Sequence, residues 1–209
     1  MKGTGVRSVG NRGGWNLAAF CVAVLAGVFL FSATAMAETQ VYLLRGWFGV
    51  FSTGLDAVAD DLQSKGIKAE AIGHLAWRNT VSKIAADRAA GKTGPLILVG
   101  HSQGANNVIE MARELEKKKI PVDLLVTLAP FMQDPVPGNV VRAMNYYQEG
   151  GWGAPLAGEK GFHGKIANIN LAGDIISTHV NVDKNARVQG DIVREVMALS
   201  KTRQAAPAR

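Results

Sequence analysis

The chain has 209 residues, of which 47% are hydrophobic and 19% are charged, and it contains a single cysteine. Three of its 23 basic residues precede residue 38, so the rest of the chain carries 20 basic and 17 acidic residues and a net charge of +3. This mild excess, without interleaved aromatic and basic residues, argues against a nucleic-acid surface, and one cysteine excludes a disulfide scaffold.

The first 37 residues predict a signal peptide. The segment opens with the basic residues Lys2, Arg7 and Arg12. An apolar run over 17–31 and an A-x-A cleavage site at 35–37 follow. The run is shorter than the ~20 residues that a membrane span needs, and Phe20 before Cys21 argues against a lipidation site. We expect cleavage before Glu38, no membrane span in the mature chain, and export to a periplasm or the medium.

From residue 39 onward, short apolar runs alternate with amphipathic stretches, which is typical of βα units around a mostly parallel sheet. Strands are predicted at 40–44, 67–73, 95–100, 122–129, 140–148 and 166–173. Helices are predicted at 54–66, 80–90, 103–118 and 191–200. The glycine-rich segment 149–164 fits neither regular element, and we expect 201–209 to be a mobile tail. The pattern predicts one three-layer α/β domain over residues 38–209.

A G-x-S-x-G element, GHSQG at 100–104, lies between a predicted central strand and a predicted long helix. This context is typical of a nucleophile elbow. The flanking glycines permit a sharp turn, and the following helix N-terminus aims amide donors at any oxyanion formed at Ser102. The alternative is a tight turn in which Ser102 only caps the helix, which leaves both glycines and His101 unexplained.

With this element and this order of strands and helices, the chain resembles the α/β-hydrolase superfamily, and GHSQG is similar to the elbows of its lipase, esterase and thioesterase branches. The resemblance implies an α/β-hydrolase fold and an oxyanion hole made by the backbone amides of Gln103 and Trp47. Trp47 is assigned because LLRGWFGVFSTG, residues 43–54, follows the first strand as the oxyanion loop of the family does. The alternative is a loop whose aromatic residues Trp47 and Phe48 only pack on the domain.

The family order places the catalytic base after the serine and after the last strand. His74 precedes the serine, and His101 belongs to the elbow, with its side chain expected to point away. His163 lies in the glycine-rich segment. The resemblance therefore assigns the base to His179, against the alternative of a loop histidine bonded to the backbone.

The catalytic acid has several candidates. Asp134 follows the strand predicted at 122–129 and stands between serine and histidine in sequence, as the family order requires, so it is our first assignment. Asp174 is its main rival, and Glu149 is the one acidic residue after the next strand. Asp183 follows His179 and so breaks the order; it would cap the closing helix or brace its loop.

These assignments imply an exported serine hydrolase that cleaves a small or lipid-like ester or thioester through an acyl-enzyme on Ser102. No cofactor or metal is implied, because H-E-x-x-H, clustered cysteines and a phosphate-binding lysine loop are all missing from the sequence. The short chain predicts an open cleft without a helical cap. Four aromatic residues either line an apolar acyl site there or are ordinary packing in surface loops: Trp47, Phe48, Trp152 and Phe162. The alternatives are an acyltransferase and an inactive binding protein, the latter favoured by the unclear acid and by Ala129 at a strand end.

Overall fold

The computed structural model describes residues 1, 3, 38–47, 49, 52–174 and 176–205. Except for residues 1 and 3, the predicted signal peptide lies outside the described residues, as do Phe48 and the last four residues. Among the helices of the described part, none is long and apolar enough to cross a membrane.

The core of the domain is a sheet of six strands, all parallel, in the order β2-β1-β3-β4-β5-β6. The strands are β1 Gln40–Arg45, β2 Lys68–Gly73, β3 Leu96–His101, β4 Leu124–Leu128, β5 Arg142–Tyr147 and β6 Lys165–Asn170. All side chains of β3 and β4 are buried, which is why their sequences are continuous rather than alternating apolar runs. The prediction of a mostly parallel sheet is confirmed.

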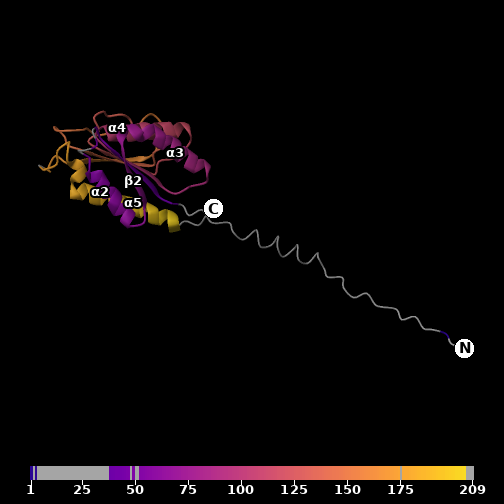
Figure 1. Cartoon of the computed structure of the whole chain (residues 1–209). Coiled ribbons are helices and arrows are strands. Elements are labelled where there is room, and N and C mark those ends of the chain that lie inside the picture. Colours follow the sequence, from indigo (N-terminus) through magenta and orange to yellow (C-terminus); the bar gives the residue numbers. More distant parts are fainter. Residues whose placement is uncertain (2, 4–37, 48, 50–51, 175, 206–209) are drawn as a thin grey trace. The chain divides into compact units, whose positions relative to one another are not determined.

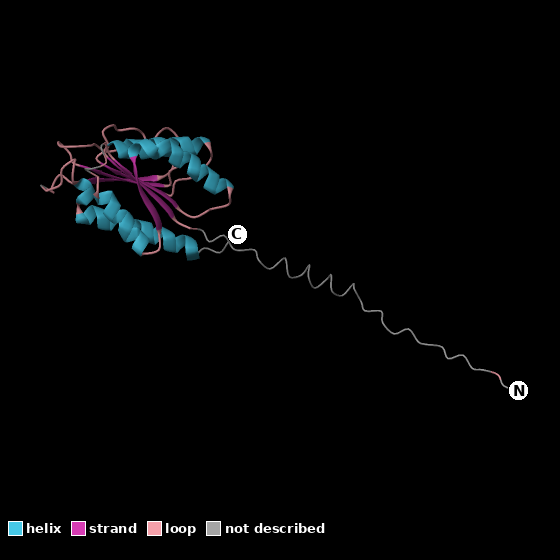
Figure 2. Ribbon diagram, viewed as in Figure 1, coloured by secondary structure: helices cyan, strands magenta, loops and turns pink. Residues whose placement is uncertain are grey.

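Helices cover both faces of this sheet, which confirms the predicted three-layer α/β architecture (Figure 1). Helices α2 (Gly54–Ser64) and α5 (Ala186–Ala205) lie on one face, and α3 (Trp77–Ala89) and α4 (Gln103–Lys117) on the other (Figure 2). Each face has its own apolar core. Leu55 of α2 and Ile192 of α5 belong to one, whereas Ile84 of α3 and Ile109 of α4 belong to the other.

Helix α5 differs most from its prediction, because it begins at Ala186 and runs to Ala205 instead of covering 191–200. Its early start has a local cause. The side-chain oxygen of Asn185 accepts hydrogen bonds from the amides of Arg187 (2.9 Å) and Val188 (3.2 Å), as a helix N-cap does. Residues 201–205, expected in the tail, are therefore the last residues of this helix.

The strand order has a topological switch point between β1 and β3. The chain passes from β1 outward to β2 and then returns to add β3 on the other side of β1. The loops that follow β1 and β3 therefore diverge at the carboxyl edge of the sheet, where parallel α/β folds form a crevice for ligands. The GHSQG segment lies at this point, directly after β3.

Candidate active site

Ser102 joins β3 to α4 in a backbone conformation that L-residues seldom adopt. Its φ is 57° and its ψ is −123°, and it is one of three non-glycine residues with positive φ in the described part of the chain. Such a conformation costs of the order of 1–3 kcal/mol and is retained only where the surroundings enforce it. The geometry is a strained strand-to-helix turn, which is compatible with the predicted nucleophile elbow; the role of Ser102 as a nucleophile stays a prediction.

The two glycines of GHSQG are required by close packing around this turn. A Cβ atom on Gly100 would lie 2.3 Å from the carbonyl oxygen of Gly104, and one on Gly104 would lie 2.1 Å from the carbonyl oxygen of Leu44. Real Cβ atoms do not approach backbone oxygens so closely. The first turn of α4 therefore packs directly against β1 and β3, and this contact sets the position of Ser102.

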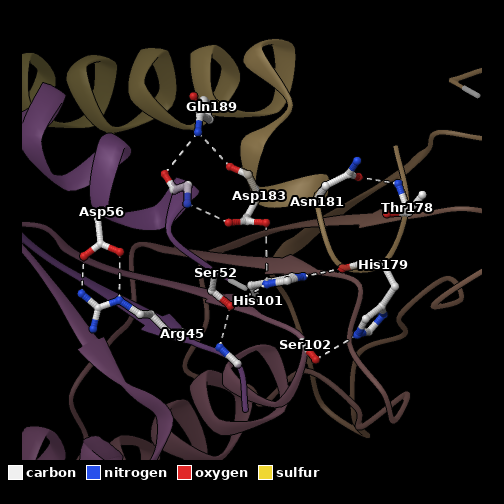
Figure 3. Close-up of polar contacts among 12 residues, drawn as sticks. Arg45, Ser52, Asp56, His101, Ser102, Thr178, His179, Asn181, Asp183 and Gln189 are labelled. Carbon is white, nitrogen blue, oxygen red and sulfur yellow. Dashed lines mark hydrogen bonds and ion pairs between the residues drawn. The ribbon is translucent and has the colours of Figure 1, made fainter. Parts of the chain in front are cut away.

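His179, the predicted base, lies within hydrogen-bond distance of the predicted nucleophile. It belongs to the loop between β6 and α5, and its Nε2 is 2.9 Å from Ser102 Oγ (Figure 3). Burial, helped by the neighbouring His101, lowers the pKa of His179 below its ordinary value of 6.5. The imidazole is therefore neutral at pH 7, as a base that accepts the serine proton must be.

Neither predicted acid is hydrogen-bonded to His179 among the described residues. The Asp134 carboxylate accepts a hydrogen bond from Asn106 (2.9 Å), whose side chain also bonds the backbone of Phe131 and Met132. Asp134 thus belongs to a network that braces the loop after β4. Asp134 is held there because its partner, Asn106, lies on the first turns of α4 next to that loop.

Asp174 is likewise bound within its own loop. Its carboxylate accepts hydrogen bonds from the amides of Ile176 and Ser177, from the Ser177 hydroxyl (2.8 Å) and from Asn185 (2.5 Å). The hydroxyl of Ser177, followed by these other donors, lowers the pKa of Asp174. The geometry thus brings Ser102 and His179 together without supporting either assignment of the acid.

His101 makes contacts that the sequence interpretation missed. Its Nε2 lies 2.7 Å from the carbonyl oxygen of His179, and its Nδ1 lies 2.8 Å from Ser52 Oγ (Figure 3). Ser52 Oγ in turn accepts a hydrogen bond from the Gly46 amide (2.9 Å). His101 is 1% exposed, and this burial lowers its pKa. A histidine inside the elbow motif is the one sequence signal that could have pointed to this network.

Asp183 lies next to His101 of this network and is fully buried. Its Oδ2 accepts a hydrogen bond from the Gly54 amide (2.8 Å) at the start of α2, so it braces its loop against α2, one of its two predicted roles. It does not cap the closing helix, because Asn185 does so. Its Oδ1 lies 4.0 Å from His101 Nδ1 and has no hydrogen-bond partner within the described part of the chain. Burial raises the pKa of this carboxyl group.

The loop after β1 touches the elbow directly. A Cβ atom on Gly46 would lie 3.0 Å from Ser102 Cβ, so the loop packs against Ser102 more closely than most side chains at this position would allow. Gln103 is the first residue of α4, where backbone amides have no partner within the helix. The positions of Gln103 and of Trp47, next to Gly46, are compatible with the predicted oxyanion hole, which stays a prediction.

An apolar cavity of about 190 Å³ opens beside the serine. Eight residues line it: Gly46, Trp47, Ser52, His101, Ser102, Phe131, His179 and Val180. The Phe131 ring lies 4.9 Å from the His179 ring and 6.2 Å from that of Trp47, between centroids. Trp152 and Phe162 do not line this cavity, because each packs against one of the two cores instead.

Within the described ranges, no group of three or more histidine, cysteine or acidic residues is placed to hold a metal ion. No protein-family model matches the chain, and no curated protein matches it either. Among solved structures, it is similar to a chain from Xanthomonas campestris pv. campestris described as a "putative hydrolase of the alpha/beta superfamily". The two are 16% identical with a TM-score of 0.41, over 78% of this chain and 98% of that one.

Proposed function

We propose that the protein is a serine hydrolase that cleaves a carboxylic ester or thioester through an acyl-enzyme on Ser102. The observation that carries the proposal is the 2.9 Å contact between Ser102 Oγ and His179 Nε2 at a strained strand-to-helix turn. A serine hydroxyl is a weak nucleophile, and a neutral imidazole at this distance is the group that activates it.

In the proposed mechanism, His179 Nε2 accepts the Ser102 proton as Oγ attacks the carbonyl carbon. The negative charge that forms on the carbonyl oxygen is stabilised by the amides of Gln103 and Trp47. The imidazolium then gives its proton to the departing alcohol or thiol. A water molecule, deprotonated by His179, releases the acyl group by the same steps in reverse order. Among the described residues this is a serine–histidine dyad, since no hydrogen bond joins a carboxylate to His179.

The cavity beside Ser102 favours a small apolar acyl group. Its volume of about 190 Å³ corresponds to roughly six water-sized groups, and Trp47, Phe131 and Val180 supply apolar walls. We therefore expect short-chain esters to be better substrates than long-chain ones. A strong requirement for a lipid–water interface would contradict this expectation.

The test of the function is the reaction of the purified protein with a fluorophosphonate probe, followed by mass-spectrometric mapping of the adduct. We expect the adduct on Ser102, with labelling and ester hydrolysis abolished in Ser102→Ala and strongly reduced in His179→Ala. Asp134→Asn and Asp174→Asn test the two predicted acids, and His163→Ala is the matched control at an exposed histidine away from the site. Well-folded protein that neither labels nor hydrolyses esters would make the inactive binding protein the better interpretation.

We also propose that the chain is exported, on the basis of the signal peptide predicted at 1–37. The mature protein would begin at Glu38 and act in a bacterial periplasm or in the medium. Intact-mass measurement of the protein from its native host tests this directly. A full-length mass, or recovery in the membrane fraction, would contradict cleavage.

A further inference from the structure

The proposed site is assembled from three segments that are distant in sequence, and one side chain contacts all three. His101 is covalently next to Ser102 in the elbow. Its Nδ1 bonds Ser52 in the loop after β1, 49 residues earlier, and its Nε2 bonds the His179 carbonyl, 78 residues later. The Gly46 amide bonds the same Ser52 oxygen. The imidazole of His101 therefore connects the proposed nucleophile to two loops. One is the loop after β1, and the other is the loop between β6 and α5 that carries His179, called the base loop below.

The partners of His101 require a hydrogen on Nε2 and are compatible with a neutral ring. A carbonyl oxygen only accepts hydrogen bonds, so the Nε2 atom that contacts the His179 carbonyl must carry a hydrogen. Ser52 Oγ already accepts from the Gly46 amide and is free to donate its own hydrogen to His101 Nδ1. Every donor then has an acceptor when His101 is the neutral Nε2–H tautomer. Burial, which lowers the pKa of His101, favours this neutral form, in which Gly46 donates to Ser52, Ser52 donates to His101 and His101 donates to the His179 carbonyl.

The base loop has a second attachment on its other side. Asp183, four residues after His179, bonds the Gly54 amide, and Gln189 Nε2 donates to the carbonyl oxygens of Gly54 (3.2 Å) and Asp183 (2.9 Å) (Figure 3). These bonds hold the part of the loop that leads into α5. Among the hydrogen bonds of the described residues, the one from His101 reaches the backbone of His179 itself.

We propose that His101 is a positioning residue, which fixes the backbone of His179 through Nε2 and the loop of Gly46 through Ser52. The inference rests on the proposed hydrolase function. Its physical basis is that a displacement of a reacting group by about 1 Å can lower a rate by about 100-fold. If the ring of His101 only filled space in the core, an apolar side chain such as leucine would preserve the activity.

Three substitutions separate these contacts. His101→Leu keeps an apolar side chain and removes both hydrogen bonds. The amide nitrogen of glutamine can occupy the place of Nε2, so His101→Gln keeps the donor to the His179 carbonyl. The amide oxygen of asparagine can occupy the place of Nδ1, so His101→Asn keeps only the acceptor for Ser52. His163→Leu is the control at an exposed histidine.

We expect His101→Leu to lower kcat on a short-chain ester by about 100-fold with little change in KM, because the base is displaced while leucine keeps an apolar wall where His101 lines the acyl cavity. His101→Gln should recover about tenfold of this loss, and His101→Asn should recover less. Wild-type kcat in His101→Leu, or equal activity of the Leu and Gln variants, would overturn the proposal.

Hydrogen exchange by mass spectrometry supplies a readout that does not depend on activity. In His101→Leu, exchange should become faster in peptides covering 45–53 and 176–182 and stay unchanged in β3 and β4. Should that variant fail to fold, Ser52→Ala should accelerate exchange in 45–53 alone. Unchanged exchange in both segments would overturn the proposal. Inactive wild-type protein with an unlabelled Ser102 would instead reject the hydrolase function, and the exchange data alone would then decide the positioning role.

Discussion

Ser102 and His179 show how backbone strain and burial act together at single residues. The turn holds Ser102 at a φ of 57°, a conformation that packing of α4 against β1 enforces. The imidazole opposite is half-buried against Phe131, so its charged form is disfavoured. The first effect fixes where the hydroxyl lies, and the second keeps its partner unprotonated.

The pH dependence of the proposed activity follows from the lowered pKa of His179. Because the neutral imidazole is the active form, activity should persist below pH 6.5 and then fall through a pKa beneath that value. The measurement is kcat/KM for a short-chain ester from pH 4.5 to 8, with circular dichroism to verify folding at each pH. A midpoint above 6.5 would mean that a carboxylate stabilises the imidazolium, which would restore a catalytic triad.

At the scale of elements, most of the fold could be predicted because the central strands are contiguous apolar runs and amphipathic helices separate the strands. Two central strands are buried on both faces of the sheet, over Leu96 to Gly100 and Leu124 to Leu128. A continuous apolar sequence predicts such a strand without any knowledge of long-range contacts. The start of α5 was missed because Ala186 to Gly190 carries a weak apolar pattern, with Val188 its one buried side chain. The helix begins there because Asn185 caps it.

The docking of α4 on the sheet makes a prediction about two glycines that look alike in sequence. Gly104→Ala should destabilise the protein by about 3 kcal/mol, because its Cβ would lie 2.1 Å from the Leu44 carbonyl oxygen and the backbone would have to move. Gly190→Ala, inside α5 with open space around the new atom, should stabilise it by about 0.5–1 kcal/mol. Denaturant unfolding measures both. Equal effects of the two substitutions would contradict the packing described for α4.

For the molecule as a whole, the site depends on contacts between segments far apart in sequence, and this limits what the sequence alone could predict. Ser102 was found because its motif is local, and His179 because family order places the base after the last strand. The contact of Ser52 with His101 spans 49 residues and that of Gly54 with Asp183 spans 129. Neither has a periodic or local signature. Asp134 met the order rule, yet its carboxylate is bonded to Asn106.

The carboxyl group of Asp183, which joins α2 to the base loop, is buried. Its burial predicts how the stability of the whole molecule changes with pH. Burial raises its pKa, so the folded state keeps a proton that the unfolded state has already lost above the ordinary value of 3.8. As pH rises from 3.8 to the raised pKa, this residue therefore makes folding less favourable, by at most about 1.4 kcal/mol per pH unit. Asp183→Asn, which keeps an acceptor for the Gly54 amide, should gain stability relative to wild type over that range.

Asp56 is the matched control, because its pKa is shifted in the opposite direction to that of Asp183. Its side-chain hydrogen bond with Arg45 lowers its pKa, so its contribution to stability is present above 3.8 and is lost as pH falls below that value. Asp56→Asn should therefore lose stability relative to wild type as pH rises from about 3 to 5. Guanidinium unfolding of wild type and both variants between pH 3 and 7 gives the two differences. If Asp183→Asn also lost stability with rising pH, the Asp183 carboxylate would be ionised and paired with a protonated His101, 4.0 Å away, and the neutral tautomer inferred for that ring would be wrong.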